Sequence, residues 1–350
     1  MKKYTLVSLL CLTSFLSVSL KAFALQTPYD ISSYGKISYP EPPQARGNIF
    51  SVSIWTGASD YFLQKTAELG VGWVRIGNGG NWRIIEPQKG VYNWESADRI
   101  VNWARANGIE PYIDVIYTPD WATSKEPYNK KNPPDDLNDY RNFVYQLVKR
   151  YNLEVVSIWH EPHIFFHGSI DEYVELTKAG YEGAKQANPN CKVLGNFGHS
   201  PKHIYDSDFP LDGLVQRGFF NYIDALTTST YTGGRIVGPE GSLAIWLEDL
   251  RDYLIAQGKP DMEFWDGAFG YSIAPEDVDT PAGGHWTLEE QADLTVRHCQ
   301  VILADPHVKF TNYWPLHGSG NGVYYTLIDM DTLEPRPVYY AYQDFISTHV

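Results

Sequence analysis

The feature that most constrains the fold is the alternation of short β-rich runs with helix-length segments along the chain. Runs such as "GWVRIG" (72–77) are rich in β-branched and aromatic residues, whereas "SADRIVNWARANG" (96–108) repeats its apolar positions at helical spacing. The expected strands are 47–55, 72–77, 109–117, 154–159, 191–198, 222–231, 262–270 and 308–316. No glycine-rich phosphate loop follows any of them. In a chain of 350 residues, this pattern predicts an α/β protein with a single (β/α)₈ TIM barrel.

The N-terminal residues have the pattern of an export signal. Lys2 and Lys3 precede an apolar run at 6–20, and "AFA" (22–24) fits a small-x-small cleavage site. We therefore expect a signal peptide at 1–24, an N-terminal extension at 25–46 and the barrel at 47–350. No later run is long and apolar enough to span a bilayer. The sequence predicts a periplasmic or secreted protein.

The charge of the chain disfavours nucleic acid and anionic membrane surfaces as partners. The net charge is −14, and cleavage after residue 24 would remove three lysines and leave −17. The 11 Trp and 25 Tyr point instead to sugar binding, because flat rings cover the apolar faces of pyranoses. The alternative for these rings is a large aromatic core. We expect a monomer that takes a carbohydrate substrate and needs no cofactor.

Two cysteines remain after the predicted cleavage, Cys191 and Cys299. A disulfide between them is possible in an oxidising compartment. Their spacing matches no metal motif, so two plain buried thiols are the alternative.

The stretch "IWHEPH" (158–163) closes the fourth expected strand. Active sites of such barrels lie at the C-terminal ends of the strands, and Pro162 prevents the strand from continuing beyond Glu161. Among aromatics such as Tyr117 and Trp159, desolvation would raise the pKa of this carboxylic acid, so that it could protonate a leaving group. A solvated glutamate at a strand end is the alternative.

The same stretch raises the question of a metal site, since His160, Glu161, His163 and His167 lie close together in sequence. "HEPH" lacks the HExxH spacing that places two histidines on one face of a helix. We therefore expect no metal, and we interpret these histidines as surface or sugar-contacting residues.

Several motifs together resemble one known group of enzymes. "GVGWVRIG" (70–77), "IWHEPH" and "NYWPLHGSGNG" (312–322) occur in an order and spacing similar to clan A glycoside hydrolases, closest to families 39 and 5, over about 47–345. The resemblance implies that Glu161 is the general acid/base and that Arg75 lies beside a second carboxylate. It also implies that Trp314 forms the floor under the cleaved sugar and that Tyr231 lies near the same subsite. We expect Tyr117, His160 and Trp265 to shape this subsite as well. Candidates for flanking subsites or for core packing are Trp82, Trp121 and Trp286.

The chain departs from the family pattern at three positions. His160 stands where the family has Asn, Ser229 where it often has His, and Ala268 where it has the nucleophilic Glu. Strand side chains alternate, so Asp266 would share a face with Ala268 while Glu263 points the other way, unless a bulge intervenes. Asp266 is thus the favoured second carboxylate, and its shorter side chain suits an inverting mechanism.

Together these observations predict an exported glycoside hydrolase that acts on a poly- or oligosaccharide, with Glu161 as acid and Asp266 as base. One alternative is a catalytically silent barrel that binds a glycan. Another is a retaining glycosidase disabled by a natural or engineered Glu-to-Ala change at 268. Elimination chemistry on an acidic sugar is disfavoured because the negative chain would repel polyanions.

Overall fold

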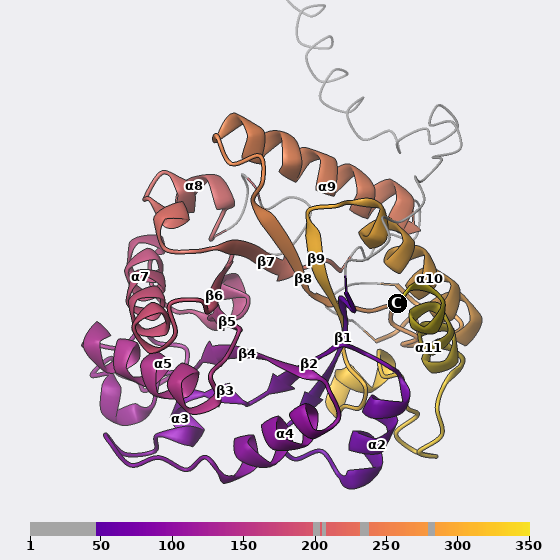
Figure 1. Cartoon of the computed structure of the whole chain (residues 1–350), viewed down its shortest axis with the longest axis horizontal. Coiled ribbons are helices and arrows are strands. Elements are labelled where there is room, and N and C mark those ends of the chain that lie inside the picture. The colour runs from indigo at the N-terminus through magenta and orange to yellow at the C-terminus, as the bar shows by residue number, and fades with distance from the viewer. Residues whose placement is uncertain (1–46, 199–203, 205–207, 232–237, 279–283) are drawn as a thin grey trace, which may run out of the picture. The chain divides into compact units, whose positions relative to one another are not determined.

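The computed structural model describes residues 47–198, 204, 208–231, 238–278 and 284–350, all within one compact unit, Tyr39–Val350. The predicted signal peptide and N-terminal extension lie outside the described residues. Parallel strands form a closed barrel with helices around it (Figure 1), so the predicted (β/α)₈ TIM barrel is confirmed. The barrel strands are β1 (Phe50–Trp55), β2 (Trp73–Gly77), β4 (Glu110–Ile116), β5 (Val155–Ile158), β6 (Lys192–Asn196), β7 (Ala225–Ser229), β8 (Glu263–Phe269) and β9 (Val308–Tyr313).

The ring closes where the first and last strands pair. β1 lies parallel to β9, with Phe50 opposite Thr311, and on its other side parallel to β2, with Ser51 opposite Trp73. In Figure 1 the indigo β1 accordingly lies beside the golden β9. β2 pairs directly with β4, and the two-residue β3 (Gly80–Asn81) extends the ladder of β4. All parallel strands therefore end at the same rim, which is where the active site was expected.

Some of the helices begin at a side chain that caps their first turn. They are α2 (Asp60–Glu68), α3 (Trp82–Ile85), α4 (Glu95–Ala106), α5 (Leu137–Tyr151), α6 (Pro162–Phe165), α7 (Ile170–Ala187), α8 (Leu211–Val215), α9 (Gly238–Ala256), α10 (Leu288–Ala304) and α11 (Pro337–His349), with 3₁₀ turns at Asp120–Ala122, Phe219–Asn221 and Gly320–Tyr324. Ser169 and Glu172 form a capping box on α7, and Thr287 and Glu290 form another on α10. Each cap satisfies backbone N–H groups that the helix leaves without partners, a gain of about 1 kcal/mol.

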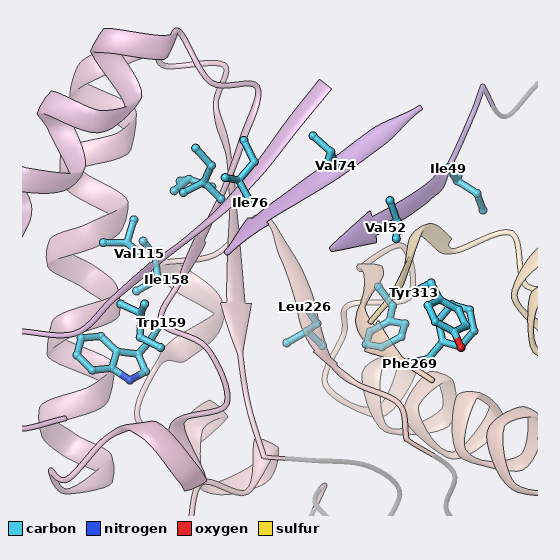
Figure 2. Packing of buried hydrophobic residues seen from close by; sticks show 14 of the residues in the cluster. Ile49, Val52, Val74, Ile76, Val115, Ile158, Trp159, Leu226, Phe269 and Tyr313 are labelled. Carbon is cyan, nitrogen blue, oxygen red and sulfur yellow. The ribbon is translucent and has the colours of Figure 1, made fainter. Parts of the chain in front are cut away.

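The outward-facing strand residues form the main hydrophobic core under the helices. Val74, Ile76, Ile158 and Leu226 are buried there (Figure 2). The helix α7 packs so closely on β5 that a Cβ at Gly180 would lie 2.5 Å from Ile158 Cδ1. This contact fixes the strand that carries Glu161 at its end.

The inside of the barrel is layered. Its lower part is an apolar plug of Tyr112, Val155, Leu194, Ala225, Trp265 and Phe310. Two residues further along most of these strands the inward side chains are polar and almost fully buried, as with Asp114, Ser157, Asn196, Thr227 and Asn312. The polar layer thus forms the floor under the C-terminal rim.

Two further predictions concern the cysteines and a membrane-spanning helix. Cys191 and Cys299 are free and buried, so the disulfide that the sequence left open is not formed. Across the described ranges, no helix combines the length and the apolar character needed to cross a bilayer.

Candidate active site

A pocket of about 360 Å³ opens at the C-terminal ends of the strands. This volume lies within the range of about 300–1,000 Å³ that is common for small-molecule sites. It brings together these predicted site residues: Arg75, Tyr117, His160, Glu161, Tyr231, Ala268 and Trp314. Most of the other lining side chains are apolar, among them Ile76, Ile116 and Phe165.

Glu161 is held at the rim by an unusual backbone turn. Its φ is +41°, a left-handed conformation that is rare outside glycine, and Pro162 directly starts the short helix α6. The N–H groups of Ile164 and Phe165 both donate to the Glu161 carbonyl at 2.9 Å. The carboxyl group, in a residue only 7% exposed, accepts a hydrogen bond from Ser229 Oγ and lies 3.7 Å from His160 Nε2. The carboxyl group is therefore fixed on the wall of the pocket.

Arg75 pairs with a second carboxylate, Asp114, which the sequence reasoning did not select. Arg75 Nε lies 2.6 Å from Asp114 Oδ2, and the Tyr112 hydroxyl lies 3.2 Å from Asp114 Oδ1. Burial alone would raise the pKa of Asp114, but Arg75 and His160 outweigh this effect and lower it. The available signal was an acidic residue inside the apolar run "YIDVIY" (112–117), at a position that alternation directs into the barrel.

Aromatic residues form another part of the wall. Tyr231 meets Trp314 edge to face, with ring centroids 6.2 Å apart, and contacts Tyr325 at 6.0 Å. Burial, with Glu161 and Tyr325 nearby, raises the pKa of Tyr231 well above its ordinary value. Burial followed by Glu161 likewise raises the pKa of Tyr117. Both phenols therefore stay protonated at neutral pH.

A β-bulge in β8 overturns the prediction that Asp266 shares a face with Ala268. Thr228 pairs with Asp266 and Ser229 pairs with Ala268, so Gly267 is an extra residue in the ladder. Past this residue the alternation is reversed, and Ala268 lines the pocket while Asp266 does not.

Asp266 lies instead on the outer side of the strand, fully buried. It accepts hydrogen bonds from Thr230 Oγ1 at 2.7 Å and Thr311 Oγ1 at 2.6 Å, and its Oδ2 lies 3.0 Å from His298 Nε2 on α10. The other candidate, Glu263, forms an ion pair with Lys192 near the start of the strand. Neither carboxylate lines the pocket, so the predicted placement of Asp266 is wrong, whereas Glu263 was not expected at this site.

Four of the tryptophans named as candidates for substrate contact or core packing do not line this pocket: Trp82, Trp121, Trp265 and Trp286, the last of which packs against the core. Trp265 belongs to the apolar plug, and Trp82 is fully buried with its Nε1 donating to Glu86 at 2.7 Å. Trp121 packs edge to face on Trp82 and donates its Nε1–H to the Glu86 carbonyl. These rings therefore stabilise the core. In the part of the chain that the structure describes, no group of three or more His, Cys, Asp or Glu side chains could hold a metal ion.

Comparisons with known proteins agree with this geometry. Residues 47–160 match glycosyl hydrolase family 10. The structure is similar to that of a family 39 glycoside hydrolase from Bacteroides cellulosilyticus, with a TM-score of 0.68, 17% identity and coverage of 85% of this chain and 63% of that one. The chain has the clan A glycoside hydrolase fold. This confirms the resemblance at the level of the clan: the sequence match over 47–160 is to family 10, and the similar solved structures include members of families 39 and 5.

Two curated relatives are similar to parts of this clan A barrel. An endo-1,4-β-xylanase B from Thermotoga neapolitana is 22% identical over 309 residues, which are 77% of this chain and 79% of the relative. A β-xylosidase from Geobacillus stearothermophilus is 29% identical over 136 residues. That alignment spans 33% of this chain but only 27% of the xylosidase's length.

The outward position of Asp266 predicts that this residue stabilises the fold and takes no part in the chemistry. Replacing Asp266 with Asn should lower the free energy of unfolding by about 1–3 kcal/mol, because the donors around it lose a charged acceptor in a fully buried site. Urea denaturation measures this change, with the exposed Asp249→Asn as the matched control. Glycan binding by the folded Asp266→Asn protein should stay unchanged. A variant as stable as the unmodified protein but unable to process glycan would instead place Asp266 in the chemistry.

Proposed function

We propose that this chain is an exported glycoside hydrolase that binds a β-linked glycan in the pocket and uses Glu161 as the proton donor. The observation that carries the proposal is the fixed position of the Glu161 carboxyl group, buried at the strand-end rim beside Ser229 and His160. A carboxylic acid so placed within an aromatic-lined pocket suits protonation of a glycosidic oxygen.

The similarity to a xylanase and a xylosidase supports a substrate built from β-linked neutral sugars. Trp314 offers a flat face on which a pyranose ring could rest, and the protonated phenols of Tyr117 and Tyr231 offer hydrogen bonds to its hydroxyls. Export is inferred from Lys2 and Lys3, the apolar run that follows them, and "AFA" (22–24).

Position 268 limits the mechanism. A retaining hydrolase holds two carboxyl groups about 5–5.5 Å apart, and the second forms a covalent bond with the sugar. The methyl group of Ala268 cannot form that bond. Hydrolysis by this chain therefore proceeds without a glycosyl ester on residue 268.

The same observation favours a second candidate, a barrel that binds glycan without cleaving it. Among the described residues that line the pocket, the carboxyl groups are those of Glu161 and Asp114, and Asp114 is bound to Arg75. Product formation separates the two candidates, because a binding protein would release no reducing ends from any glycan.

Replacement of Glu161 with Gln tests its role as acid. We expect kcat/KM for natural oligosaccharides to fall by about 10²- to 10⁴-fold, because the leaving alcohol then departs without a proton. Dinitrophenyl glycosides should lose much less, since their leaving group needs no protonation. Released ends are followed by proton NMR, with the exposed Glu95→Gln as control. Equal losses on both substrate classes would contradict the role of Glu161 as acid.

Placing a carboxylate at position 268 tests whether a nucleophile there would reach the anomeric carbon. The Ala268→Glu variant should gain hydrolysis of aryl β-xylosides with retention of configuration, because it supplies the missing nucleophile beside Glu161. The matched Ala268→Gln variant has the same shape but should gain nothing. Mass spectrometry after reaction with a 2-fluoro glycoside should detect an adduct on the Glu variant alone. If neither variant forms an adduct, position 268 does not face the anomeric carbon.

A further inference from the structure

Position 268 is a specific place in the wall of the pocket. Ala268 pairs across the sheet with Ser229, whose hydroxyl group holds the Glu161 carboxyl group. Neighbouring strands lie about 4.8 Å apart, close to the spacing of about 5–5.5 Å between the two carboxyl groups of retaining glycosidases. A group that attacks the anomeric carbon of a sugar protonated by Glu161 would therefore act from the space above Ala268.

The described residues around the pocket offer no side chain for that role. Asp266 faces outward just before the bulge, and its carboxyl oxygens are bound by Thr230, Thr311 and His298. Asp114 is held by Arg75 at 2.6 Å, and its lowered pKa makes it a weak base. No described residue of this wall therefore supplies the attacking group, and a substrate that carries its own would need none from the protein.

We propose that the glycan carries a 2-acetamido group on the sugar to be cleaved, and that its carbonyl oxygen attacks the anomeric carbon from the space above Ala268. This inference rests on the proposed function. An acetamido group has as many non-hydrogen atoms as the part of a Glu side chain that Ala lacks, so it fits the space that Ala268 leaves. Its methyl group also suits a wall that is largely apolar, with Ala268, Trp314 and Tyr325.

The reaction balances without any further reagent. The acetamido oxygen forms a bond to C1 while the bond from C1 to the leaving oxygen breaks, and that oxygen takes the proton of Glu161. The products are the free alcohol, a cyclic oxazolinium ion and the Glu161 carboxylate. Water then attacks C1 and gives one proton to Glu161, which restores the acetamido sugar with its configuration retained.

The charges in the pocket favour a neutral amide over an acidic sugar. The positive charge of Arg75 is already compensated by Asp114, and Glu161 adds a carboxyl group that becomes negative during the cycle. The carboxylate of a uronic acid would be repelled by this negative charge. Among the described pocket residues, Arg75 is already paired with Asp114 and so cannot compensate it. An acetamido group brings the attacking oxygen without bringing a charge.

The experiment compares aryl 2-acetamido-2-deoxy-β-glucoside with the matched aryl β-glucoside and aryl β-xyloside, using the unmodified protein. We expect kcat/KM for the acetamido sugar to be at least about 100-fold higher, since the intramolecular carbonyl has a large effective concentration. Replacing the acetyl hydrogens with fluorine should lower the rate stepwise, because the carbonyl oxygen becomes less nucleophilic. Proton NMR should show retention, and Glu161→Gln should remove turnover of unactivated chitin oligosaccharides.

The outcomes show whether the acetamido inference alone fails or the proposed function fails with it. Cleavage of the xyloside or glucoside as fast as the acetamido sugar, with no fluorine effect, would overturn the inference and leave Glu161-dependent hydrolysis intact. Binding of all glycans by calorimetry without cleavage would also overturn the inference and favour the binding protein. Neither binding nor cleavage of any glycan would remove the proposed function as well.

Discussion

The bulge at Gly267 in β8 is the constraint on which the site depends. A Cβ at this position would lie 2.7 Å from Thr227 Oγ1, so a larger residue would fit only if the buried Thr227 side chain moved. The side-chain amide of Asn312 donates to the Gly267 carbonyl at 3.0 Å and fixes the extra residue in place. Because one residue is added to one strand alone, each side chain beyond it changes face. The bulge thus determines that Ala268 faces the pocket, while Asp266, which precedes it, faces outward.

The outward-facing carboxylate of Asp266 stabilises this wall of the pocket from its outer side. Asp266 joins β8 to β9 through Thr311, to the end of β7 through Thr230, and to α10 through His298. The His298 ring also stacks on Phe269, with centroids 3.8 Å apart. A fully buried carboxylate with several donors is costly to disturb, so this wall is rigid. The space above Ala268 is therefore a fixed feature of the pocket and does not come from loose packing.

Much of the fold follows from the sequence because alternation of strand and helix patterns is a local signal that repeats along the chain. The position of Glu161 follows too, since Pro162 ends its strand and parallel strands end at one rim. The face of Asp266 could not be predicted, because whether a glycine in a strand adds a bulge depends on the neighbouring Thr227 and Asn312. The role of tryptophans such as Trp82 stayed open for a similar reason: the ring is apolar enough for the core and flat enough for a sugar, and only its burial distinguishes the two.

In glycosidases, proton donation and nucleophilic attack usually come from two carboxyl groups of the protein. In the function proposed here, the protein supplies only the first of the two. In the proposed function Glu161 donates the proton, while the charges of the Arg75–Asp114 pair compensate each other and exert little net charge on the sugar. Under this proposal the site activates the leaving group, and its described residues provide no covalent partner. Turnover would then depend on which atoms the bound sugar brings to C1, so the chemistry of the substrate would decide whether the barrel cleaves a glycan or only binds it.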